Sequence, residues 1–183
     1  YDNLVKRHGV KIVREMATGV DPAKRTVRLA NGQELPYDRL ILAPGIDFMP
    51  IPGWDPNKIP HAWQAGPQTT LLKNQLANMP SRGTFVMTIP KAPYRCPPGP
   101  YERACQIAWY LKRAKPRSKV LILDANEDVT SKKGLFTKAW NEEYKGLVEY
   151  KPNHVLTDVD VGTMTLKFET ADNVKADVLN VIP

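Results

Sequence analysis

The sequence predicts an α/β fold in which a parallel sheet is covered by helices. Residues 83–89 form an apolar strand pattern, and residues 119–123 form a second one. Between the two lie a loop and a helical pattern over residues 100–115, and the second strand closes on Asp124. This order of strand, loop, helix, strand and acidic residue is the opening unit of a dinucleotide-binding fold.

The first part of the chain is expected to form a helix followed by short strands. Residues 1–8 have a helical pattern that ends at Gly9, a usual residue just past a helix C-terminus. Asn31-Gly32 predicts a hairpin turn, and Asp21-Pro22 predicts another turn. The runs expected as strands are residues 10–13, 26–29, 33–35 and 37–43.

Between the two parts, residues 46–68 are rich in proline and are expected as a linker or surface loop. A helical pattern resumes over residues 71–76 and is cut off by Pro80. A further helix is expected over residues 133–145. The remaining strands are expected at residues 147–151, 155–158, 164–168 and 178–182.

Composition excludes several classes of protein. The chain has 183 residues, of which 42% are hydrophobic, so it can bury a substantial core. No apolar run approaches the ~18 residues of a membrane span. The net charge is +7, but the densest basic run, residues 112–119, lies where cations complement a helix C-terminus, and no aromatic residues interleave it. We therefore expect no nucleic-acid partner.

Since the chain starts at Tyr1 and stops on a strand pattern, we expect it to be a piece of a longer polypeptide.

The cysteines and histidines predict no metal site. Cys96 and Cys105 lie nine positions apart, and the three histidines are scattered, which fits no zinc spacing. Cys105 falls inside the predicted helix, about 7 Å or more past its start at 1.5 Å per residue. A bridge to Cys96 would strain disulfide geometry, so Cys105 is expected to be a packing residue.

The loop after the first strand lacks what a dinucleotide needs. In this fold the loop carries G-x-G-x-x-G, whose backbone N–H groups meet the pyrophosphate. Here five of the eleven residues 90–100 are prolines, which have no N–H, and one is glycine. We therefore expect the nucleotide site to have been replaced, no binding of NADH, and a role for Asp124 as a helix cap or a relic.

Cys96 is the candidate reactive residue of this loop. It precedes a helix that Pro98 or Pro100 would open, and the positive helix end together with Arg95 favours the nucleophilic thiolate. The alternative is a buried, inert cysteine in a rigid turn.

Glu102 lies in the first turn of the same helix. Its carboxylate either complements the helix dipole or acts as an acid/base beside the sulfur, and both interpretations stay open.

The stretch Arg95-Cys96-Pro97-Pro98-Gly99-Pro100-Tyr101-Glu102-Arg103-Ala104 resembles the flavoprotein subunit of flavocytochrome c sulfide dehydrogenase, a relative of the sulfide:quinone oxidoreductases. Agreement extends through residues 42–46, 60–66, 118–124 and 175–183. The resemblance implies a fragment of a two-dinucleotide-binding-domain flavoprotein. Residues 1–48 would be part of the FAD-binding domain, residues 49–79 a linker and connecting helix, and residues 80–183 a degenerate, NADH-like Rossmann domain.

The resemblance also implies the chemistry. Cys96 would be one half of a redox-active disulfide over the flavin, with Glu102 nearby as an acid/base. The residues expected to lie against FAD are Pro44, Gly45, His61 and Trp63. Sulfide would be the substrate, and electrons would leave to haem c on a cytochrome c subunit in the periplasm.

Parts of this machinery are not visible in the sequence. The main FAD-phosphate motif, the cysteine for covalent flavin attachment and the second redox cysteine are expected outside this chain, which alone should be inactive. One alternative is an enzyme of the sulfide:quinone type, whose electrons go to a quinone. The other is a non-catalytic docking module built on a degenerate nucleotide fold.

Overall fold

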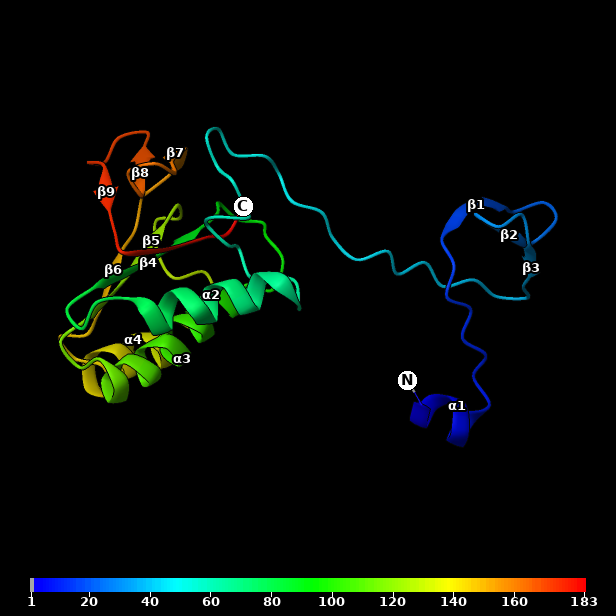
Figure 1. Ribbon diagram of the computed structural model, residues 1–183, viewed down its shortest axis with the longest axis horizontal. Coiled ribbons are helices and arrows are strands. Elements are labelled where there is room, and N and C mark those ends of the chain that lie inside the picture. The colour runs from blue at the N-terminus through cyan, green and yellow to red at the C-terminus, as the bar shows by residue number, and fades with distance from the viewer. Residues whose placement is uncertain (1) are drawn as a thin grey trace. The chain divides into compact units, whose positions relative to one another are not determined.

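The computed structural model describes residues 2–183, which form two compact units, the first ending at Asp47 and the second running over Phe48–Pro183. The first unit holds one helix and a three-stranded antiparallel sheet of order β1-β2-β3 (Figure 1). Its elements are α1 (Asp2–His8), β1 (Ala17–Asp21), β2 (Thr26–Leu29) and β3 (Glu34–Pro36).

The hairpin predicted at Asn31-Gly32 is confirmed. Gly32 has a φ of +83°, a conformation that favours glycine, and the Asn31 side chain accepts a hydrogen bond from the Gln33 N–H at 3.0 Å. The turn therefore sets the register that pairs β2 with β3. The helix predicted over residues 1–8 is confirmed as α1, except that Tyr1 lies outside the described residues.

Two predicted strands of this unit are wrong. Residues 10–13 and 37–43 form no strand, and Ile41 and Leu42 are 89% and 72% exposed. An apolar run becomes a strand only when a neighbouring strand pairs with its backbone groups, and within residues 2–47 no strand does so. In contrast, β1 was missed because its sequence has no alternating apolar pattern. It forms by pairing with β2.

The second unit is built on a four-stranded parallel sheet of order β10-β4-β5-β6, and beside it lies an antiparallel sheet of order β7-β8-β9. The predicted elements are present, α4 ending at Glu142 rather than at residue 145, and β9 is additional. They are α2 (Pro67–Asn78), β4 (Thr84–Ile89), α3 (Gly99–Ala114), β5 (Lys119–Asp124), α4 (Lys133–Glu142), β6 (Val148–Lys151), β7 (Leu156–Asp160), β8 (Thr165–Phe168), β9 (Val174–Lys175) and β10 (Val178–Val181).

The parallel sheet is buried on both faces. Figure 1 shows α2, α3 and α4 on one side of it and the small sheet β7–β9 on the other. Along β4, Phe85 and Met87 join the core beneath the helices, whereas Val86 joins the core beneath β7–β9. Burial on both faces explains why these strands read as continuous apolar runs. No helix within residues 2–183 is long and apolar enough to cross a membrane.

Candidate functional site

Cys96 lies three residues before α3, at the carboxyl edge of the parallel sheet. The thiol is free and the residue is exposed. Its φ is +59°, an uncommon conformation for a residue with a Cβ, and strain of this kind concentrates at functional sites. Gly99 is the first helical residue and its N–H donates to the Cys96 carbonyl at 2.8 Å. The prediction that Pro98 or Pro100 takes this first position is wrong by one residue, because Pro98 caps the helix and Pro100 is second.

Trp63 meets Cys96 at Gly99. A Cβ placed on Gly99 would lie 3.0 Å from Cζ2 and Cη2 of Trp63 and 3.1 Å from the Sγ of Cys96. Because both side chains crowd the same point, only glycine fits there without displacing one of them. The structure thus brings together two candidate residues that are separated by more than thirty positions in the sequence.

Arg103 is a residue of this site that the sequence analysis missed. Its guanidinium lies 4.4 Å from the centroid of the Trp63 ring, a cation–π contact. It donates to the His61 carbonyl at 2.7 Å, to Asn180 Oδ1 at 3.1 Å and to the Ala62 carbonyl. Burial lowers its pKa to about 10, and no carboxylate within residues 2–183 pairs with it. The sequence did contain one indication that Arg103 belongs to the site: it lies four residues after Gly99 and therefore on the same face of α3.

His61 holds the backbone of Trp63. Its side chain is 5% exposed, its Nδ1 accepts the Trp63 N–H at 2.9 Å, and the Phe48 ring lies 4.0 Å away between centroids. Burial, assisted by the positive charge of Arg103, lowers the pKa of His61 below its ordinary value of 6.5. The imidazole is therefore neutral in the folded chain and serves as an acceptor.

This depressed pKa predicts a pH dependence of stability. Since the unfolded chain takes up a proton at His61 below about pH 6.5 and the folded chain takes it up only at lower pH, the free energy of unfolding should fall as the pH drops through this value. Urea unfolding from about pH 7.5 to about pH 5.5 measures the effect. In His61→Asn, whose Oδ1 can replace Nδ1 as acceptor, this contribution should vanish. An unchanged slope would contradict the assignment.

Three of the other predicted site residues, Pro44, Gly45 and Glu102, are exposed. Pro44 and Gly45 belong to the first unit, where both are exposed, and a Cβ on Gly45 would meet no atom within 4 Å. Glu102 is exposed in the first turn of α3, and its carboxylate forms no hydrogen bond or ion pair with another residue of 2–183. Both interpretations of Glu102 therefore stay predictions. Cys105 is half-buried beneath the helices, as predicted for a packing residue, and burial raises its pKa.

Asp124 is buried and fully hydrogen-bonded, so the prediction of a helix cap is wrong. It is 0% exposed, and its Oδ2 accepts from the hydroxyls of Tyr101 at 2.7 Å and Tyr150 at 3.0 Å. Its Oδ1 accepts from the N–H and the side-chain amide of Asn126 at 2.9 and 2.7 Å. Burial raises the pKa of both phenols, so they remain donors. Asp124 ends β5, at the position where this fold binds a ribose, and both of its carboxylate oxygens already accept hydrogen bonds.

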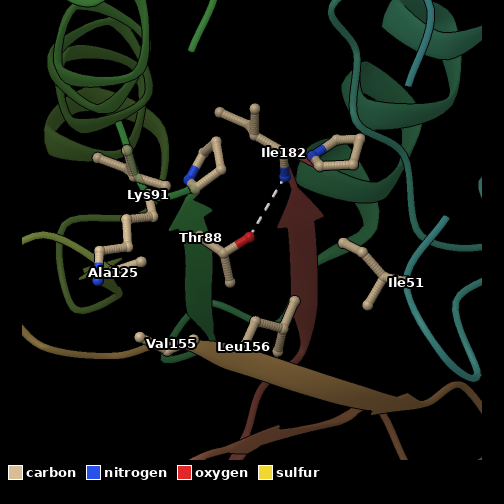
Figure 2. A pocket seen from close by; sticks show the side chains of 10 residues that line it. Ile51, Thr88, Lys91, Ala125, Val155, Leu156 and Ile182 are labelled. Atoms are coloured by element: carbon tan, nitrogen blue, oxygen red, sulfur yellow. Dashed lines mark hydrogen bonds between the residues drawn. The ribbon is translucent and has the colours of Figure 1, made fainter. Parts of the chain in front are cut away.

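The crevice beside Asp124 is apolar and small. A cavity of about 160 Å³ lies at the carboxyl ends of β4 and β10, and Figure 2 shows the side chains that line it. This is the point where strand order reverses and where nucleotides bind in this fold. Ligand sites usually enclose about 300 Å³ or more. The Thr88 hydroxyl already accepts the Ile182 N–H at 3.2 Å. The lining residues are Ile51, Thr88, Ile89, Pro90, Lys91, Ala125, Val155, Leu156, Ile182 and Pro183.

The residues around Cys96 fit the ring end of a flavin and not its phosphates. The loop presents a thiol beside an indole edge, but its five prolines have no N–H, and the N–H groups of Ala92 and Gly99 are already bonded. Phosphate binding in this fold needs free backbone N–H groups. Within residues 2–183, no three His, Cys, Asp or Glu side chains are placed to hold a metal ion.

The fold and the site, together with the family match given below, define a class, the two-dinucleotide-domain flavoprotein oxidoreductases, in a variant whose loop over residues 90–100 has five prolines and one glycine. The fold is shared with the sulfide:quinone oxidoreductase from the hyperthermophilic bacterium Aquifex aeolicus (TM-score 0.71, 18% identity, 98% of this chain and 44% of that chain). It is also shared with an NAD-dependent persulfide reductase from A. fulgidus (TM-score 0.71, 16% identity, 99% of this chain and 33% of that chain).

The chain belongs to the family of sulfide dehydrogenase (flavocytochrome c) flavoprotein chains, whose central region matches residues 69–183. This confirms the resemblance carried by the loop around Cys96. The chain spans less than half the length of the two solved chains.

Proposed function

We propose that this chain is part of a longer polypeptide, the whole protein. We propose further that the whole protein is an FAD-dependent sulfide dehydrogenase that passes electrons to cytochrome c. One observation carries the proposal: an exposed free cysteine, Cys96, is held at positive φ against Trp63 in a nucleotide fold whose own nucleotide position is closed. The parallel sheet is retained, but Asp124 at the ribose position is already hydrogen-bonded and the loop at the phosphate position is rich in proline. We therefore expect no binding of NADH there. The reactive group at this edge of the sheet is then the sulfur.

The chemistry starts at a disulfide between Cys96 and a second cysteine of the whole protein. Hydrosulfide attacks one sulfur, the S–S bond breaks, the attacked cysteine becomes a persulfide and the other leaves as a thiolate. The positive end of α3 stabilises a thiolate at Cys96. Glu102 is the candidate acceptor for the proton of the persulfide. FAD, when bound, supplies the acceptor for the electron pair released by the sulfur.

Two residues of the second unit are proposed to lie against the flavin, Trp63 and His61. Trp63, fixed by His61 and Arg103, would contact the ring system beside Cys96. Pro44 and Gly45 of the first unit stay candidate flavin contacts on the family resemblance alone, and the φ of +86° at Gly45 is one that favours glycine. Haem c on a cytochrome c subunit is the proposed electron acceptor, and the periplasm is the proposed location.

The test is anaerobic mixing of the whole protein with sulfide, followed by addition of an acceptor. We expect sulfide to bleach the flavin absorbance and a c-type cytochrome to restore it, while a soluble quinone analogue does not. Restoration by the quinone alone would support the sulfide:quinone alternative. A protein that carries no flavin and does not respond to sulfide would reject both enzymes and favour the docking module.

A further inference from the structure

The loop that carries Cys96 cannot be held by its own backbone. Among residues 90–98 four prolines lack an N–H, and the Cys96 carbonyl bonds only to the start of α3, at Gly99. A loop of this kind needs side chains to fix it. The positive φ of Cys96 makes that need greater, because an unrestrained cysteine relaxes to negative φ.

The start of the loop is held by Asn126. The side-chain amide of Asn126 donates to the Pro90 carbonyl at 3.1 Å and accepts the Ala92 N–H at 2.9 Å. The same amide donates to Asp124 Oδ1 at 2.7 Å. The first residues of the loop are thereby connected to a buried carboxylate that cannot move.

The end of the loop is connected to the same carboxylate through hydroxyl groups. The Tyr94 hydroxyl donates to the Pro97 carbonyl at 3.2 Å and lies 2.6 Å from the Thr130 hydroxyl. The Thr130 hydroxyl lies 3.2 Å from the Tyr101 hydroxyl, which also accepts the Thr130 N–H at 3.0 Å. Tyr101 in turn donates to Asp124 Oδ2 at 2.7 Å. Cys96 lies between the two connections.

We propose that Tyr94, Thr130, Tyr101 and Asp124 form a latch that positions the Cys96 loop for reaction with sulfide. Asp124, at the position where this fold binds a ribose, thus anchors the loop that carries Cys96. These are positioning residues, since none of them contacts the sulfur. The inference rests on the proposed function for its consequence in catalysis, but the latch itself is a property of the loop.

The test compares three variants of the whole protein. Thr130→Val removes the central hydroxyl and keeps the shape of the side chain, whereas Thr130→Ser keeps the hydroxyl. Tyr110→Phe removes a phenol hydroxyl from α3 that takes no part in the network and is the control. The first measurement is hydrogen–deuterium exchange at the Gly99 amide, which reports opening of the loop whether or not the enzyme turns over.

In Thr130→Val, loss of one hydrogen bond should make the Gly99 amide exchange about fivefold faster. It should lower kcat for sulfide about tenfold with little change in KM, because a misplaced reacting group costs rate more than binding. Thr130→Ser should restore both quantities, and Tyr110→Phe should change neither.

Unchanged exchange in Thr130→Val would overturn the latch. So would a Thr130→Ser variant as impaired as Thr130→Val, because the hydroxyl would then not be the cause. Failure of the proposed function looks different: Cys96→Ser would retain activity while Thr130→Val still accelerated exchange. Faster exchange with unchanged kcat, in a protein inactivated by Cys96→Ser, would show that the latch does not position the sulfur.

Discussion

Cys96→Ser in the whole protein is expected to lower kcat for sulfide oxidation by more than about a thousandfold, because serine cannot form the disulfide that sulfide attacks. The substitution removes no buried contact, since Cys96 is exposed, and the loop keeps its hydrogen bonds to Tyr94 and Asn126. With both proteins fully reduced, so that neither holds the proposed disulfide, its thermal unfolding should therefore match that of the unchanged protein. The measurement is steady-state reduction of a c-type cytochrome by sulfide.

Cys105→Ala provides the matched control. This thiol belongs to α3 and is half-buried against the core, so the variant should lose some stability and keep its sulfide activity. Peptide mapping under non-reducing conditions should find Cys96, and not Cys105, linked to a second cysteine. A Cys96→Ser enzyme with activity near that of the unchanged protein would remove Cys96 from the reaction and leave the docking module as the better interpretation.

Asp124→Ala is expected to lower the free energy of unfolding by about 3–5 kcal/mol. The carboxylate is fully buried and accepts four hydrogen bonds, so its removal leaves the donors of Tyr101, Tyr150 and Asn126 without partners. A cavity of side-chain size adds to the cost. Urea unfolding of the chain near neutral pH measures the loss.

Two further variants make the Asp124 result interpretable. Asp124→Asn keeps one acceptor oxygen and should be less destabilising than alanine. Asp128→Ala removes an exposed carboxylate paired with Lys133, and its effect should be small because such pairs contribute little in water. If Asp124→Ala unfolded at the same urea concentration as the unchanged chain, Asp124 would be a relic of the nucleotide site and not a structural centre.

The second unit was predictable from the sequence because its signals are local. The strands β4 and β5 are apolar over their whole length, and α3 has an amphipathic pattern with prolines at its start. The predictions for residues 10–13 and 37–43 failed for the opposite reason. These runs have strand composition, but a strand requires a partner, and pairing is a property of the surrounding chain.

Some residues of the candidate site were likewise predictable from the sequence, and others were not. The proline-rich loop and its cysteine are contiguous, so the sequence alone identified Cys96. The approach of Trp63 to Cys96 depends on how the segment before α2 crosses the start of α3. Arg103 was not singled out in the sequence, and only its contacts with Trp63 and the His61 carbonyl reveal a partly buried cation of the site.

By itself, the sequence determined that a nucleotide fold is present, that its phosphate loop lacks the glycines and N–H groups that bind phosphate in this fold, and that a cysteine stands in that loop. These conclusions follow from the backbone properties of proline and glycine, which each residue carries wherever it lies. Only the tertiary structure decided the role of Asp124. Whether a carboxylate at the end of a strand binds a ribose, caps a helix or anchors a loop depends on which donors surround it, and Tyr101, Tyr150 and Asn126 come from three different segments.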